Sequence, residues 1–154
     1  MRKYSRNKGI TLIEILASIA IMLILGSISI SVFSRLANTT SLDRDVSIVA
    51  SYIEKARTEA INSVDSLAHG VKFETNKVTV FKNTSYSLAN LETYYDIPGK
   101  TIISDISLSG GATSLYFNKL TGAPNVTGTI TLSLSDGTSD RSITIYATGI
   151  IDIQ

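Results

Sequence analysis

Cysteine and tryptophan are absent from the 154-residue chain, and histidine occurs once, at His69. Without cysteine the chain has no disulfide, no thiolate zinc site and no thiol nucleophile. A single histidine leaves little room for a histidine-based metal site or a serine–histidine pair. The sequence also contains no Gly-x-Ser-x-Gly elbow and no phosphate-binding glycine-rich loop. We therefore predict no enzyme, no catalytic residue, no metal site and no cofactor.

Neither sign of charge dominates. Lys and Arg number 14 and Asp and Glu 13, so the formal net charge is +1. This balance argues against a polycationic nucleic-acid-binding protein. Only 18% of the residues are charged and the mean hydropathy is positive. The length suits one compact domain, so the apolar residues must be concentrated in part of it.

Most of these apolar residues lie near the N-terminus. Between Ile10 and Phe33, 17 of the 24 residues are apolar and only Glu14 is charged. About 20 apolar residues are needed to cross a bilayer as a helix. A buried helix of a soluble protein is the alternative, but the rest of the chain is too short to surround it. We therefore predict a transmembrane helix over residues 10–33.

The residues before this segment are basic. They include Arg2, Lys3, Arg6 and Lys8 and no acid. Such a flank holds its end of a spanning helix in the cytoplasm. No small-residue cleavage site follows the apolar run, so the segment is retained rather than removed as a secretory signal. We expect a single pass through the inner (cytoplasmic) membrane, with the remainder of the chain outside the cytoplasm.

Glu14 stands five residues into the apolar run. An ionised carboxylate in hydrocarbon is costly and usually faces a specific partner. A glutamate close to the membrane interface can instead extend its side chain to water. Position alone leaves both interpretations open.

The string Gly9-Ile-Thr-Leu-Ile-Glu14 resembles the processing site of type IV prepilins and type II secretion pseudopilins. In that family a short basic leader is cut after glycine by a membrane peptidase, and the new N-terminus is methylated. The resemblance implies a leader over residues 1–9, cleavage between Gly9 and Ile10, N-methylation of Ile10 and retention of Glu14 as an assembly charge. One departure is Ile10, where the family most often has phenylalanine.

The implied cleavage leaves an ammonium group on Ile10 in the membrane zone. The carboxylate of Glu14 on a neighbouring subunit can pair with it, and such a pair is far stronger in a low dielectric than in water. The pair would set the axial stagger between subunits. We therefore expect as partners other pilin or pseudopilin subunits, contacted through the N-terminal helix, together with the prepilin peptidase and inner-membrane lipid.

No proline precedes Pro98, so the helix can continue past the membrane segment. One apolar face repeats at spacings of three and four residues, through Leu42, Val46, Val49, Ile53, Ala56 and Ala60. We predict helix from residue 10 to residue 62, amphipathic over 34–62. Gly26 with Ser27 allows local bending or melting of the helix, and residues 38–41 are a candidate weak point or N-cap run between the two helix halves.

Residues 63–154 read as a β-sheet head domain. Residues 70–74 and 77–81 predict a hairpin around a two-residue turn. Residues 84–99 contain many breakers and are expected to form a looser region. Further short strands are predicted over 100–103, 106–108, 114–118, 129–133, 141–146 and 150–153. We expect His69 at the surface or at the helix end, without a metal role.

The segment Tyr52–Ile61, with its Ala-Arg-x-Glu-Ala-Ile run, resembles the helix end of GspH/FimT-type minor pseudopilins. Residues 115–122, 128–132 and 141–151 follow the order of strands in that subgroup. The resemblance implies an α+β, pilin-like fold, with a long N-terminal helical spine packed on an antiparallel β-sheet head. It also implies a minor pilin or pseudopilin that helps to initiate or cap fibre assembly in a type IV pilus or type II secretion system.

Two other functions stay open. The subgroup includes DNA-binding minor pilins for DNA uptake, but Lys119 and Arg141 are the only cations after Gly110. Phosphate binding needs several clustered cations, so we do not expect nucleic acid as a partner. A signal-anchored extracytoplasmic binding domain is the third hypothesis, and it predicts that Glu14→Ala is neutral.

Overall fold

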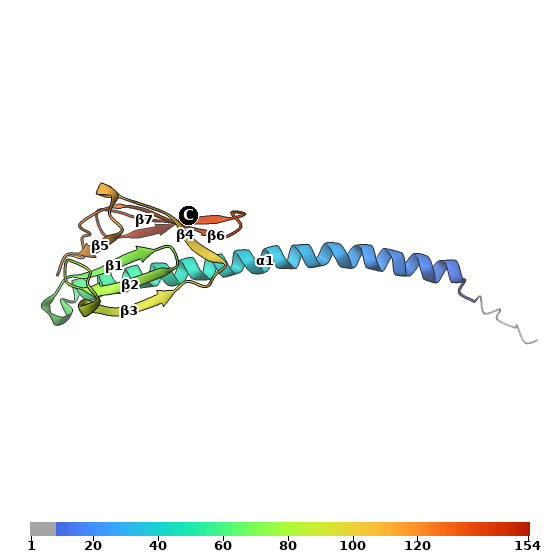
Figure 1. Cartoon of the computed structure of the whole chain (residues 1–154), viewed down its shortest axis with the longest axis horizontal. Coiled ribbons are helices and arrows are strands. Elements are labelled where there is room, and N and C mark those ends of the chain that lie inside the picture. Colours follow the sequence, from blue (N-terminus) through green and yellow to red (C-terminus); the bar gives the residue numbers. More distant parts are fainter. Residues whose placement is uncertain (1–8) are drawn as a thin grey trace, which may run out of the picture. The chain divides into compact units, whose positions relative to one another are not determined.

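The computed structural model describes residues 9–154, except the side chains at positions 28–32 and 34 of its long helix (Figure 1). The basic residues Arg2, Lys3, Arg6 and Lys8 lie outside the described residues. By its contacts the chain divides near Ala37 into two units.

Helix α1 (Leu12–Ile61) runs without interruption through both units. The helix predicted over residues 10–62 is therefore confirmed, whereas the weak point predicted at residues 38–41 is wrong because those residues are helical. Gly26 is helical as well. No helix built from the described residues combines the length and the apolar character of a membrane span. The membrane segment expected over residues 10–33, part of which falls on undescribed side chains, stays a prediction.

After the helix the chain forms eight strands and three short 3-10 helices. In order they are η1 (Val64–Ser66), β1 (His69–Glu74), β2 (Lys77–Lys82), η2 (Leu88–Asn90), β3 (Leu91–Asp96), β4 (Thr101–Leu108), η3 (Ser109–Gly111), β5 (Ser114–Phe117), β6 (Gly128–Leu134), β7 (Asp140–Ile145) and β8 (Ile151–Ile153).

The strands form two antiparallel sheets of four strands. Their orders are β3-β2-β1-β5 and β4-β6-β7-β8. The hairpin predicted around residues 75–76 is confirmed, since Glu74 pairs with Lys77 across the two-residue turn. The α+β fold of a helix packed on antiparallel sheets is confirmed too.

Two strand predictions are wrong. Residues 100–103 and 106–108 belong to one strand, β4, whose register against β6 shifts between Ile103 and Asp105. A bulge of this kind leaves an extra residue unpaired and breaks the alternation that a sequence pattern relies on. Residues 91–96, expected to be loose, form the edge strand β3, which pairs with β2. None of its residues is buried, so no apolar pattern marks it.

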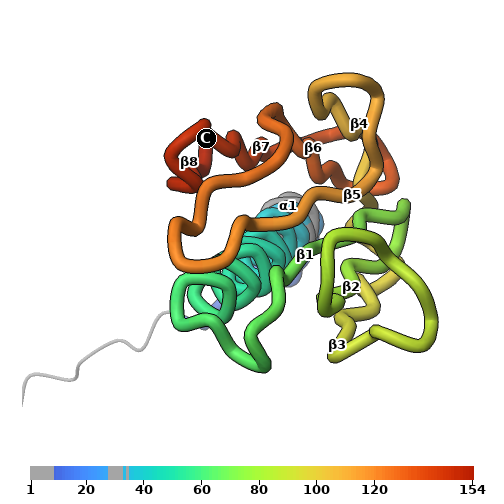
Figure 2. The backbone as a smooth tube through the Cα atoms, turned by 90° about the vertical axis from the view of Figure 1, so that its left-hand side faces the viewer, coloured from blue at the N-terminus to red at the C-terminus, as the bar shows by residue number. Residues whose placement is uncertain are grey.

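The core of the head joins the helix to both sheets. The helical face predicted from the spacing is buried at all six positions, Leu42, Val46, Val49, Ile53, Ala56 and Ala60. It contacts apolar side chains that both sheets turn inward, among them Phe73, Val80, Ile130 and Ile143. Figure 2 shows the C-terminal part of α1 between β1–β3 and β6–β8. Each large side chain buried in this way contributes about 1.5–3 kcal/mol.

Candidate functional site

The N-terminal candidate site begins with Thr11, which precedes the first helical residue. Its Oγ1 accepts a hydrogen bond from the Glu14 amide at 3.3 Å. This is the N-cap interaction that satisfies one of the free amides of a first helical turn. The acid of Glu14 in that turn also faces the positive end of the helix dipole. Local chemistry therefore begins the helix at Leu12, with Thr11 as its N-cap.

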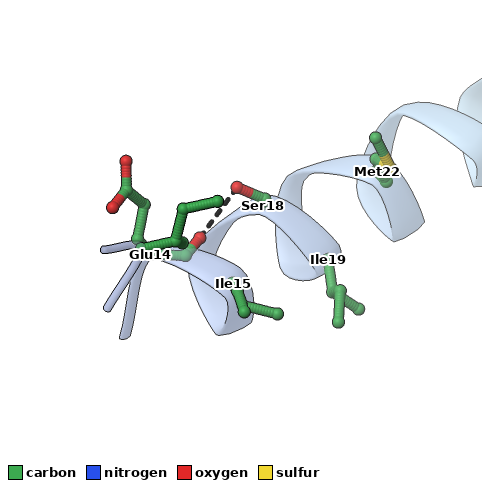
Figure 3. Close-up of a pocket in the computed structure, with 6 residues that line it drawn as sticks. Glu14, Ile15, Ser18, Ile19 and Met22 are labelled. Carbon is green, nitrogen blue, oxygen red and sulfur yellow. Dashed lines mark hydrogen bonds between the residues drawn. The ribbon is translucent and has the colours of Figure 1, made fainter. Parts of the chain in front are cut away.

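Glu14 and its neighbours line a shallow, mostly apolar groove on the side of the helix. The lining residues are Ile10, Glu14, Ile15, Ser18, Ile19 and Met22 (Figure 3). Ser18 donates a hydrogen bond to the backbone carbonyl of Glu14 at 2.7 Å. The Glu14 carboxylate extends outward from the helix (Figure 3), and no ion pair with another described residue engages it. The pairing of Glu14 with Ile10 of a neighbouring subunit stays a prediction.

The Ala-Arg-x-Glu-Ala-Ile run occupies the last turns of α1, and its Arg57 contacts the loop between β7 and β8. Ala56 and Ala60 are fully buried. The Arg57 side chain lies over Gly149, where a Cβ atom would approach Arg57 Nε to 2.8 Å. Gly149 has a φ of +79°, which favours glycine. Arg57 thus connects the end of α1 to the loop that carries Thr148 and Gly149.

His69 is fully buried, so the expectation of a surface position is wrong. Its Nε2 lies 3.2 Å from the carbonyl oxygen of Val64. Its Nδ1 lies 3.4 Å from Oε2 of Glu59 and 3.4 Å from Oε2 of Glu92. These three groups come from β1, α1 and β3, which is why no local sequence pattern brings them together. We call them the His69 cluster.

Lys55 contacts both glutamates of the His69 cluster. Its Nζ lies 3.1 Å from Oε1 of Glu92 and 3.4 Å from Oε1 of Glu59. Burial, followed by the charge of Glu92, raises the pKa of Glu59. Burial is also the largest single influence on Glu92 and acts in the same direction, but the hydrogen bond from Lys55, the charge of Lys55 and the contact with Glu59 together outweigh it and lower the pKa of Glu92. The structure thus holds two carboxylates close together, with one ammonium group on one side.

Helix α1 also carries a fully buried acid, 14 residues before Glu59. Asp45 is fully buried, and its Oδ1 accepts a hydrogen bond from the Tyr95 hydroxyl at 2.9 Å. Burial, together with this hydrogen bond and the charge of Asp45, raises the pKa of Tyr95 to about 12. Sequence reasoning missed the burial of Asp45 and the partial burial of Glu59 and Glu92. The one available signal was an acid within an otherwise apolar helical face.

The cations after Gly110 do not cluster. Arg141 Nε forms an ion pair with Oδ1 of Asp43 at 2.9 Å, and Lys119 Nζ lies 3.5 Å from the Ser66 carbonyl oxygen. Arg141 is thus already paired with an acid. This arrangement offers no concentrated positive surface for a phosphate backbone.

Comparison with known families returns two matches. A model described as the prokaryotic N-terminal methylation motif matches residues 4–30. A model described as type II transport protein GspH matches residues 46–149, which is more than half of the chain. No curated protein and no solved structure matches the chain. The two matched segments coincide with the N-terminal motif and with the helix-and-strand head.

Proposed function

The chain belongs to the GspH family of type II transport proteins, and on that basis we propose that it helps to initiate or cap the assembly of the fibre. The family membership and the N-terminal methylation motif make it a minor pseudopilin or pilin of a type II secretion system or type IV pilus. Proteins of this family are structural subunits that associate with other pseudopilins or pilins. The proposed work is therefore assembly, not catalysis.

The observation that carries this proposal is that the apolar side chains at the N-terminal end of α1 are exposed. Leu12 and Met22 are 79% and 73% exposed, and most of the large apolar side chains described between residues 10 and 25 are at least half exposed. Contiguous apolar surface of this kind marks a membrane or protein interaction site. We propose that lipid covers it before assembly and that helices of other subunits cover it in the fibre.

We further propose that maturation prepares this surface. Hydrolysis of the Gly9–Ile10 peptide bond by the prepilin peptidase would release residues 1–9 and leave an ammonium group on Ile10, which is then methylated. Gly9 and Ile10 are exposed and precede the helix, so the bond is not held in regular structure. The Glu14 carboxylate of a neighbouring subunit would pair with the new ammonium. Both charges would otherwise be unpaired in an apolar surrounding, which is costly.

The intact mass of protein extracted from membranes tests maturation. The expected mass is that of residues 10–154 plus one methyl group. The same measurement in cells without the peptidase provides the control, and there the full mass should be retained. Protein that keeps residues 1–9 in a working apparatus would contradict the proposal.

Glu14→Ala tests the assembly charge. We expect this variant to insert in the membrane and fold its head, yet fail to enter the fibre. Glu54→Ala is the matched control, because Glu54 lies on the same helix and its one ion pair among the described residues is with Arg57, at 3.7 Å. Crosslinking to the other subunits and recovery in sheared fibres are the readouts. Equal recovery of both variants would favour a signal-anchored binding domain instead.

An initiating or capping role has its own test. Deleting the protein should lower the number of fibres per cell, whereas the length of the remaining fibres changes little. Purified fibres should contain it at a small fraction of the main subunit. A content comparable with the main subunit would show a bulk structural role.

A further inference from the structure

The His69 cluster brings three acceptor atoms together in the head. Since Nε2 of His69 lies beside the Val64 carbonyl oxygen, it is the nitrogen that donates a hydrogen. In the neutral ring Nδ1 is then an acceptor, and it faces Oε2 of Glu59 and Oε2 of Glu92. All three atoms are buried, and none has a hydrogen-bond partner in the described part of the chain.

The two carboxylates are held in this orientation from the other side. Lys55 contacts Oε1 of both glutamates, so their Oε2 atoms turn toward His69. With a neutral imidazole, the two carboxylates and the ammonium leave one net negative charge. Three converging acceptors without a donor are unfavourable in a buried site. The cluster therefore demands a positive species at its centre.

We propose that Glu59, His69 and Glu92 bind a divalent transition metal ion, with Zn²⁺ as the best fit. The three ligand atoms lie within 4.8 Å of one another. In a tetrahedral site with bonds of about 2.0–2.1 Å, neighbouring ligand atoms are separated by about 3.4 Å. Both distances from His69 Nδ1 have this value. One imidazole and two carboxylates are a ligand set that zinc accepts, and they leave a fourth position for water.

A proton on Nδ1 is the competing occupant, and the geometry fits it less well. An imidazolium N–H donates to one carboxylate oxygen at about 2.7–2.9 Å. Here two oxygens lie at an equal and longer distance. The side chains of Glu59 and Glu92 are 19% and 22% exposed, so an ion can reach the cluster from solvent.

The ion would join three elements of the head. Glu59 belongs to the last turns of α1, His69 opens β1 and Glu92 lies in the edge strand β3. Binding to the folded state only would stabilise the attachment of both strands to the helix, because such ligands are not assembled in the unfolded chain. This site is independent of the assembly role proposed for Glu14.

The test uses the full-length chain in detergent, purified without a polyhistidine tag and stripped with a chelator. Zn²⁺ binding is measured by titration calorimetry, and Co²⁺ is added separately because its visible absorption reports tetrahedral coordination. We expect one ion per chain and a higher melting temperature with Zn²⁺. Glu59→Gln and Glu92→Gln should each weaken Zn²⁺ binding by at least about tenfold. Even the loss of a residue that only hydrogen-bonds to a metal ligand typically weakens metal binding by about this factor.

Glu54→Gln is the matched control, since Glu54 lies on the same helix and its only ion pair among the described residues is with Arg57. It should bind Zn²⁺ like the unsubstituted chain. Far-UV circular dichroism verifies that each variant is folded, and two separate glutamine variants guard against one that does not fold. Absence of Zn²⁺ binding in the unsubstituted chain, or equal binding by Glu54→Gln and a folded Glu59→Gln or Glu92→Gln, would overturn the proposal and assign a proton to the cluster.

Discussion

Replacing Tyr95 by phenylalanine removes the hydroxyl group that donates a hydrogen bond to the buried Asp45. The other oxygen, Oδ2, has no hydrogen-bond partner among the described residues. Arg44 is the remaining neighbour, but its Nη2 lies 3.4 Å away on a side chain that is 63% exposed. The substitution therefore leaves a buried carboxylate almost without a donor.

The expected loss at neutral pH follows from this contact. A hydrogen bond to a charged group contributes about 1.5–3 kcal/mol. We expect Tyr95→Phe to lower the free energy of unfolding by this amount. For a head of this size the melting temperature should fall by roughly 3–5 °C per kcal/mol.

The same contact predicts a dependence on alkaline pH. The rise of the Tyr95 pKa from 10.0 to about 12 means that the folded state holds the phenolic proton more tightly than the unfolded state. The stabilisation is fully present below pH 10 and is lost as the pH rises toward 12. Such a rise corresponds to roughly 2.7 kcal/mol, which partial exposure of Tyr95 reduces to about 1–2 kcal/mol.

Denaturant unfolding of the full chain in detergent, followed by near-UV circular dichroism between pH 7 and 12, measures both effects. The stability difference between the unsubstituted chain and Tyr95→Phe should shrink as the pH rises through 10–12. Tyr94→Phe is the matched control, because the Tyr94 ring is half exposed and contacts Lys77. A difference that stays constant with pH, or an equal loss in Tyr94→Phe, would refute the reasoning.

Two further substitutions test the packing of the head by denaturant unfolding. Gly149→Ala should lower the free energy of unfolding by at least about 2 kcal/mol more than Gly137→Ala. Both glycines have a positive φ, but only at Gly149 would the added Cβ approach a backbone oxygen, that of Gly122, to 2.2 Å. Equal effects of the two substitutions would contradict this close approach. Ile53→Ala should cost about 2–5 kcal/mol since Ile53 is fully buried, whereas Leu88→Ala at an 82% exposed position should change stability by less than about 0.5 kcal/mol.

The features predictable from the sequence depend on spacing within one segment. The apolar face of α1 repeats with the helical period, so the spacing alone predicts the six positions that the structure buries. The first hairpin followed from two alternating segments around a two-residue turn. The sequence also supplied the Gly9–Glu14 motif, whose residues are neighbours in the chain.

The features that only the tertiary structure decided depend on elements that meet across the head. His69 was expected at the surface or at the helix end because it lies between a helix and a strand in the sequence, yet β3 and the end of α1 bury it. Strand β3 itself was not predicted, because an edge strand without a buried residue carries no apolar period. The meeting of Glu59, His69 and Glu92 is set by sheet order and by helix docking, which side-chain spacing along the chain does not encode.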